Sequence, residues 1–246
     1  MKAFVVASAA LVASVGAAMS ADLPVRAVSY TAAPYNWSGC YIGAQAGYAI
    51  QNNGNEQFTA AGARSPTTPA EEANPDGWKA GGFIGCNLQF AGPWVIGIEG
   101  DGEWADLNGD ARYNEPLGDN YLSRTRVQGS LRGRLGYAVD RLFFYGTGGG
   151  AIADIRYTYN NFPGPVTQSL SEVGFGFTGG LGIEYAFAGN WTGRIEYRYA
   201  DFGTIKQTAG IAFPGFTENH RVTENAVRVG LGYKFGGAPP PPSYPR

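Results

Sequence analysis

The chain has 246 residues, including 38 glycines, 15 prolines and two cysteines; 14% of its residues are aromatic and 15% are charged. Glycine is about twice as frequent as usual and charged residues are scarce, which excludes a disordered chain as well as a collagen repeat. A formal net charge of −2 gives no sign of nucleic-acid binding. Two cysteines are too few for a disulfide-rich miniprotein or a four-cysteine zinc site.

Residues 1–21 have the pattern of a secretory signal peptide. A positive start at Lys2 precedes an uncharged run of small apolar residues, and small residues around Ser20 suit cleavage. The run is too weakly apolar for a membrane-spanning helix. We therefore expect export, with residues 22–36 serving as a periplasmic N-terminal tether.

The remaining chain repeats short segments in which apolar side chains alternate with small or polar ones. A period of two is typical of a β-strand whose two faces meet different environments. In Trp191–Tyr199, for example, the odd positions are apolar or glycine and the even ones are threonine or charged. The other seven segments are Cys40–Tyr48, Phe83–Phe90, Trp94–Trp104, Arg126–Tyr137, Leu142–Ile155, Val173–Phe187 and Val227–Phe235.

Short and long connections alternate between these segments. Residues 91–93, 140–141 and 188–190 make short links, whereas residues 51–79, 105–123, 158–169 and 203–221 make long ones. This alternation is typical of outer-membrane barrels, with periplasmic turns and extracellular loops. We predict a single all-β domain over residues 37–235: an eight-stranded antiparallel up-and-down transmembrane β-barrel in the cell outer membrane.

The polar faces of the segments are expected to line the lumen. Their acids and bases are nearly balanced, and the interior of an eight-stranded barrel is usually filled by side chains. A soluble barrel with its charged face in water is the alternative. The predicted ion-pair network comprises Glu99, Asp101, Glu103, Arg126, Arg132, Arg134, Glu184, Arg194, Glu196, Arg198, Arg228 and Lys234.

Aromatic residues gather at the strand ends nearest the short turns, as expected at a membrane–water boundary. This predicted girdle comprises Trp37, Trp94, Tyr137, Phe187, Trp191 and Phe235. Tyr48, Trp78, Trp104, Tyr157, Tyr199 and Phe202 are candidates for the opposite belt.

Cys40 and Cys86 both fall on outward-facing positions of neighbouring segments. Export would place them in an oxidising compartment, so a disulfide between them is a hypothesis, with their register left open.

Several motifs resemble the small outer-membrane β-barrels of alpha-proteobacteria, known as porin-family or outer-membrane immunogenic proteins. They are residues 36–43 (NWSGCYIG), 94–101 (WVIGIEGD), 132–137 (RGRLGY), 195–199 (IEYRY) and 227–235 (VRVGLGYKF). The resemblance implies a monomeric eight-stranded barrel with a structural or surface role and no cofactor. Such chains commonly end on the aromatic residue of the last strand, whereas here a proline-rich tail, residues 236–246, follows Phe235. Either the barrel-assembly machinery reads an internal signal ending at Phe235, or it recognises this chain more weakly than usual.

The sequence predicts a non-enzymatic barrel with a role in envelope integrity and surface display. His220 is the only histidine, which gives little basis for a catalytic triad or a metal site, so we expect no catalytic, cofactor-binding or metal-binding residues. The expected partners are outer-membrane lipid, lipopolysaccharide and the assembly machinery, and not nucleic acid. A small-solute channel, a surface adhesion or ligand-binding protein, and a membrane-embedded lipid enzyme are the alternatives.

Overall fold

A computed structural model describes residues 34–59, 74–114, 119–161, 166–208 and 216–236. The predicted signal peptide, most of the N-terminal tether and nearly all of the proline-rich tail lie outside these residues. In the described part of the chain, no helix has the length and apolar character needed to cross a membrane.

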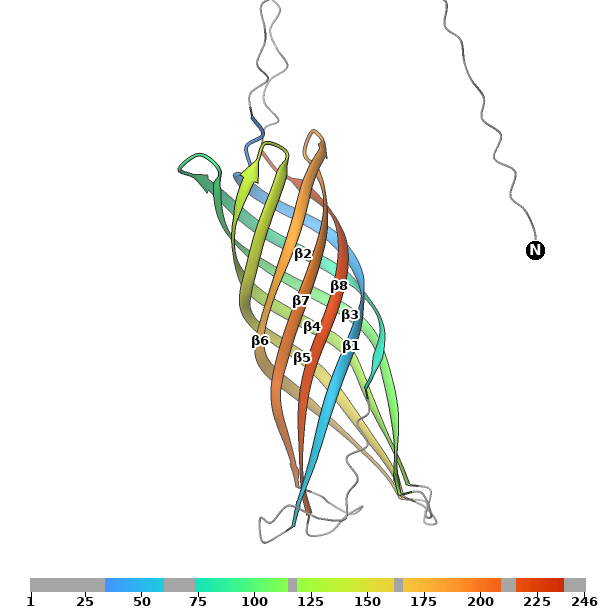
Figure 1. Cartoon of the computed structure of the whole chain (residues 1–246). Coiled ribbons are helices and arrows are strands. Elements are labelled where there is room, and N and C mark those ends of the chain that lie inside the picture. Colours follow the sequence, from blue (N-terminus) through green and yellow to red (C-terminus); the bar gives the residue numbers. More distant parts are fainter. Residues whose placement is uncertain (1–33, 60–73, 115–118, 162–165, 209–215, 237–246) are drawn as a thin grey trace, which may run out of the picture. The chain divides into compact units, whose positions relative to one another are not determined.

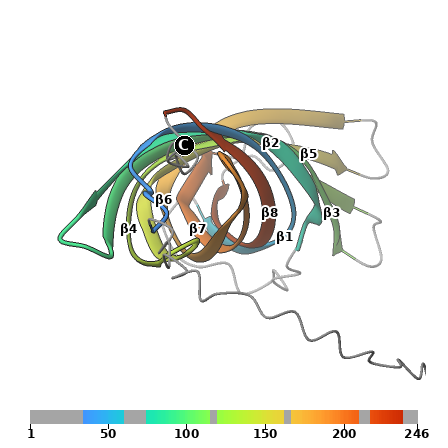
Figure 2. The ribbon, with the colours of Figure 1, turned by 90° about the horizontal axis from the view of Figure 1, so that it is seen from above.

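Eight antiparallel strands form a closed barrel in which each strand pairs with the next and the last pairs with the first. Figure 1 shows the strands winding around the barrel, and Figure 2 looks along it from above. The predicted up-and-down order is confirmed. The strands are β1 (Gly39–Thr59), β2 (Asp76–Phe90), β3 (Trp94–Asn114), β4 (Asp119–Val139), β5 (Leu142–Asn161), β6 (Val166–Ala188), β7 (Trp191–Thr208) and β8 (Phe216–Lys234).

Apolar side chains face outward and charged ones face the lumen. On β7 the side chain of Ile195 is 62% exposed, whereas that of the adjacent Glu196 is 1% exposed. A soluble protein does not leave so continuous an apolar surface in water. This arrangement suits a barrel surrounded by hydrocarbon, where closure also leaves no unpaired strand edge.

The strands are longer than the alternating sequence segments predicted. Both ends of the segment 51–79, expected to be a loop, belong to β1 and β2, which extend to Thr59 and back from Asp76. β3 and β4 likewise continue to Asn114 and from Asp119. Backbone pairing continues past the membrane because it satisfies N–H and C=O groups whatever the side chains are. The apolar–polar alternation ends earlier, because hydrocarbon no longer selects the outward residues.

Glycines on the inner face of the wall let strands and side chains approach closely. A Cβ atom on Gly149 of β5 would lie 2.1 Å from the carbonyl oxygen of Leu131 on β4. On Gly182 of β6 it would lie 2.4 Å from the Tyr145 ring. A larger residue at either position would push the wall or the lumen side chains apart.

Candidate functional site: the filled lumen

The periplasmic end of the lumen is closed by the segment that precedes β1. Tyr35 and Trp37 are buried there among Val95, Phe143 and Tyr145. The Trp37 ring lies 5.1 Å from the Phe143 ring, centroid to centroid. We call Tyr35, Trp37 and Phe143 the aromatic plug.

The β4–β5 turn holds this plug in place. Tyr35 N–H donates to the Asp140 carboxylate at 2.9 Å, and Trp37 Nε1 donates to the Asp140 carbonyl oxygen at 2.9 Å. Asp140 has a φ of 51°, a left-handed conformation that asparagine and aspartate tolerate better than most residues. The turn residue therefore both reverses the chain and anchors the plug.

Above the plug, Arg134 lies between aromatic rings and carboxylates. Its guanidinium carbon is 3.9 Å from the centroid of the Tyr145 ring and 5.4 Å from that of Phe143. Its Nη2 atom donates to Glu184 at 2.7 Å. The aromatic plug and the charged layer are thus joined through one side chain.

Glu99 is the centre of the charged layer, because three arginines from two sides of the barrel converge on its carboxylate. Arg132 and Arg194 donate to it at 2.6 Å, and Arg134 at 3.1 Å. Tyr41 adds a hydroxyl hydrogen bond at 2.8 Å. The carboxylate links β1, β3, β4 and β7 across the lumen.

A second centre lies farther toward the extracellular end, around Glu196 and Asp101. Arg198 donates to Glu196 at 2.7 Å and to Asp101 at 3.0 Å. Arg132 also donates to both, at 3.2 Å and 2.8 Å. Arg132 therefore connects this centre to Glu99.

The third centre joins β2, β3 and β8. Arg228 makes two hydrogen bonds of 2.9 Å with the Glu103 carboxylate. Lys79 pairs with Glu103 at 3.0 Å and with Glu224 at 2.7 Å. Gln128 also donates to Glu224, at 2.6 Å.

Acids and bases are equal in number across the three centres. Six carboxylates stand against six cations, so the formal charges cancel (6 − 6 = 0), and each of the twelve has a partner of opposite charge. The acids are Glu99, Asp101, Glu103, Glu184, Glu196 and Glu224, and the bases are Lys79, Arg132, Arg134, Arg194, Arg198 and Arg228.

Little open space remains inside the described part of the lumen. A cavity lined by Asp101, Ser130, Thr178, Arg198 and Arg228 has a volume of about 10 Å³. That is close to the smallest space that holds one water molecule. An apolar layer lies beyond it, formed by Ala49, Ala105, Leu107 and Ala226.

Eleven of the twelve predicted network residues face the lumen, and ten of them lie in the three centres. The eleventh, Lys234, lies beside the plug instead, where it donates to the Asn36 carbonyl oxygen and lies 4.4 Å from the Tyr35 ring centroid. The prediction for Arg126 is wrong: this side chain is exposed on the outer face. It falls at a β-bulge, where one extra residue reverses the alternation.

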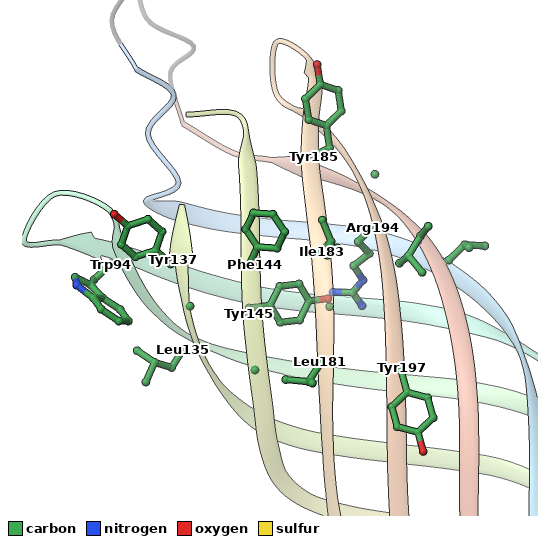
Figure 3. Close-up of a pocket in the computed structure, with 17 residues that line it drawn as sticks. Trp94, Leu135, Tyr137, Phe144, Tyr145, Leu181, Ile183, Tyr185, Arg194 and Tyr197 are labelled. Carbon is green, nitrogen blue, oxygen red and sulfur yellow. The ribbon is translucent and has the colours of Figure 1, made fainter. Parts of the chain in front are cut away.

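The girdle prediction is wrong for Trp37, which is 1% exposed within the plug. Trp37 precedes the regular ladder of β1, so strand alternation does not govern its direction. Tyr157 and Phe202, candidates for the opposite belt, are also buried. The other girdle residues are exposed on the outer wall: Trp94, Tyr137, Phe187, Trp191 and Phe235. Figure 3 shows Trp94 beside Tyr137, and their rings meet edge to face at 5.4 Å.

Sequence reasoning missed Lys79 and Glu224. Both positions continue the alternation of the recognised segments by a few residues toward the extracellular end, so extending the period of two would have found them. Tyr41 and Tyr145 were missed for a different reason. An inward tyrosine in a polar lumen carries no sequence signal that separates it from a lipid-facing one.

Cys40 and Cys86 form a disulfide in the structure. They are direct partners in the β1–β2 register and both lie on the exposed outer face. The bond therefore joins the first two strands at the periplasmic end, close to where β1 also pairs with β8.

Between β7 and β8, Arg221 donates to the Asp201 carboxylate at 2.7 Å. Burial raises the pKa of Asp201, but hydrogen bonds from Arg221 and from Gly203 N–H outweigh it and hold the pKa below its usual value. His220 lies on β8 opposite Asn55 and Ile205, and its side chain lies outside the described residues.

The fold defines a small transmembrane β-barrel, and ion-paired side chains occupy its lumen. The sequence model described as "Outer membrane protein beta-barrel domain" matches residues 7–235. The chain therefore belongs to this outer-membrane β-barrel family, and the protein is located in the cell outer membrane.

Named relatives agree with this assignment. The chain is 32% identical over 240 residues to the 25 kDa outer-membrane immunogenic protein of Brucella abortus, covering 96% of this chain and 99% of the relative. It is 34% identical over 256 residues to the 31 kDa outer-membrane immunogenic protein of Brucella melitensis, covering 96% and 100%. The 22 kDa outer membrane protein of Rhizobium leguminosarum is 29% identical over 200 residues, covering 81% and 79%.

Solved structures support the fold alone. The outer membrane protease OmpT of Escherichia coli superposes with a TM-score of 0.51 at 10% identity, covering 80% of this chain and 97% of that one. The relatives reported above are named as membrane or immunogenic proteins rather than enzymes.

Proposed function

We propose that the protein is a non-conducting, non-enzymatic barrel that contributes to the integrity of the outer membrane and displays its extracellular hairpins at the cell surface. One observation carries this proposal: the lumen is occupied by a charge-balanced network and closed by the aromatic plug. A solute that crossed the barrel would have to displace these buried ion pairs.

The arrangement is better suited to holding the wall together than to transport. Each of the three centres joins strands that are not neighbours in the sheet, as Glu99 of β3 does with Arg194 of β7. Desolvation offsets much of the Coulomb attraction of buried pairs, yet removing one partner leaves a costly unpaired charge. The network therefore favours one barrel geometry over alternatives.

Conductance in planar bilayers tests the closed lumen. We expect the wild-type barrel to give no stable single-channel conductance, whereas a Trp37→Ala/Phe143→Ala variant gives brief openings because its plug is weakened. Heat-modifiable gel mobility of the same samples verifies that both are folded. A large and stable conductance from the wild type would establish the small-solute channel instead.

The envelope role is tested in a deletion strain of the source bacterium. We expect raised sensitivity to detergent, restored both by the wild-type chain and by the His220→Ala variant. Restoration by the wild type alone, together with a change in lipid turnover, would favour the lipid enzyme. If the deletion strain were no more sensitive to detergent than the wild-type strain, the proposed role in membrane integrity would be wrong.

A further inference from the structure

Three arginines lie together on the outer face of the wall, on the extracellular side of Trp104, a residue of the predicted opposite belt. Arg124 and Arg126 are on β4 and Arg156 is on β5, and all three are exposed. Arg124 and Arg156 are direct partners in the β4–β5 register. We call these three residues the arginine cluster.

The level of the cluster follows from the strand register. Trp104, 78% exposed on β3, pairs with Val127 of β4, and Arg126 is the next residue toward the extracellular end. Exposed tryptophans mark the boundary between hydrocarbon and headgroups. The arginines therefore lie at the height of the outer-leaflet headgroups.

A β-bulge brings Arg126 into the cluster. The register shifts at this residue against both neighbouring strands, between Trp104 and Leu107 on β3 and between Thr125 and Val127 on β4. Without the shift, Arg126 would continue the alternation of Gln128 and point into the lumen. Bulges commonly re-aim a side chain at a functional position.

The guanidinium groups of the cluster are not neutralised by ion pairs within the described part of the chain. Among the described residues, Arg124 and Arg126 make no ion pair, whereas the exposed Arg221 is paired with Asp201. Arg156 donates through Nε to the Ser171 hydroxyl at 3.1 Å. Like charges directly opposite each other on neighbouring strands destabilise a sheet unless an anion lies between them.

The surroundings specify what kind of anion fits. Val127 and Ile152 form an exposed apolar surface on the membrane side of the cluster. Asp106 and Asp154 lie at its edge, so the face has a formal charge of +1 (3 − 2). A lipid whose phosphate lies at the arginines and whose acyl chains lie against the apolar surface matches this face. Each guanidinium group can donate two parallel hydrogen bonds to a phosphate.

We propose that Arg124, Arg126 and Arg156 bind a phosphate on the headgroup of a phosphorylated glycolipid in the outer leaflet. The acyl chains of the same molecule then lie along the apolar wall below. The bulge at Arg126 has the function of turning a third guanidinium toward this phosphate. This interaction is separate from the proposed closure of the lumen.

Binding to the folded barrel in nanodiscs tests the proposal, with a bisphosphorylated lipid A as the probe and its dephosphorylated form for comparison. We expect Arg124→Gln/Arg126→Gln/Arg156→Gln to weaken binding of the phosphorylated lipid by at least about tenfold. Arg221→Gln is the matched control, since it removes an exposed but paired arginine, and should change the affinity by less than about twofold.

Further measurements separate a lipid site from general anion binding. Arg126→Lys keeps the positive charge but loses the planar guanidinium group that donates two hydrogen bonds at once. Its affinity for the phosphorylated lipid should therefore lie between those of the wild type and the triple variant. Equal binding by the wild type and the triple variant would overturn the proposal. Equal binding of the phosphorylated and dephosphorylated lipids, or full competition by millimolar inorganic phosphate, would also overturn it. Heat-modifiable mobility verifies folding of every variant.

Discussion

The barrel wall has two zones that obey different rules. In the membrane zone, which on β3 runs from Trp94 to Trp104, outward and inward residues alternate without interruption. In the protruding zone beyond it, the register shifts in the β3–β4, β4–β5 and β7–β8 pairs. One further shift, near Ala186, adjoins a periplasmic turn.

The difference shows where hydrocarbon controls the structure. A one-residue slip in the membrane zone would expose a row of charges to lipid, and each arginine near the bilayer centre costs ~2–4 kcal/mol. In the protruding zone the outer face meets headgroups and water, so a bulge costs little. Irregular features, including the bulge that points the Arg126 side chain outward, therefore occur where they cost little free energy.

The largest effect is expected from breaking the first centre in the membrane zone. Glu99→Gln leaves three buried guanidinium groups without their shared carboxylate, so we expect the free energy of unfolding to fall by ~3–5 kcal/mol. Urea unfolding in lipid vesicles, followed by tryptophan fluorescence, measures this. Glu172→Gln changes an exposed acid on β6 and serves as the control. An equal effect of both variants would contradict the special position of Glu99.

Removing the disulfide should have the next largest effect. Replacing Cys40 and Cys86 with serine frees a loop with a sequence separation of 46 in the unfolded chain. From the entropy that this loop regains in the unfolded chain, we expect the free energy of unfolding to fall by up to about 4 kcal/mol. The measurement is urea unfolding of the double variant against the wild type. Reducing agent should lower the free energy of unfolding of the wild type to that of the double variant, and it should leave the double variant unchanged.

A charge on the lipid face tests the membrane zone directly. Ile195→Arg should lower the free energy of unfolding by ~2–4 kcal/mol, because the guanidinium would lie near the bilayer centre. Thr223→Arg on β8 places the same residue in the protruding zone, where we expect a change within about 0.5 kcal/mol. Similar losses at both positions would refute the division into two zones.

The smallest effect is expected at the pair formed by Asp201 and the exposed Arg221. The hydrogen bonds that lower the pKa of Asp201 stabilise the fold above the unfolded pKa of this group, and that stability is lost as the pH falls through the folded pKa. Arg221→Gln should therefore lower the free energy of unfolding only slightly at pH 7, and by still less in acid. Unfolding curves at both pH values measure the difference. A larger effect in acid would contradict this assignment.

The fold was largely predictable because membrane β-barrels follow a simple physical rule. Alternation identified the wall residues of β3, β6 and β7, and the alternating lengths of the connections gave the direction of the barrel. Glu99, Glu196 and Arg132 could be placed in the lumen from their position in the alternation alone. The pairing partners of these residues could not, because they come from strands that are distant in the sequence.

Local geometry accounts for the wrong predictions. Trp37 lies before the ladder begins, and Arg126 lies where the ladder gains a residue. Neither place has a backbone period that a sequence pattern can report. The strand ends beyond the outer belt were missed because pairing there depends on backbone hydrogen bonds and not on side-chain type.

The amino-acid sequence alone determined the class of the barrel, its location and the sidedness of its membrane zone, because lipid and lumen select side chains at every second position. Tertiary structure alone decided the three centres, the aromatic plug and the arginine cluster. Each of these depends on the register between strands and on contacts across the barrel, which bring together residues that no local pattern connects.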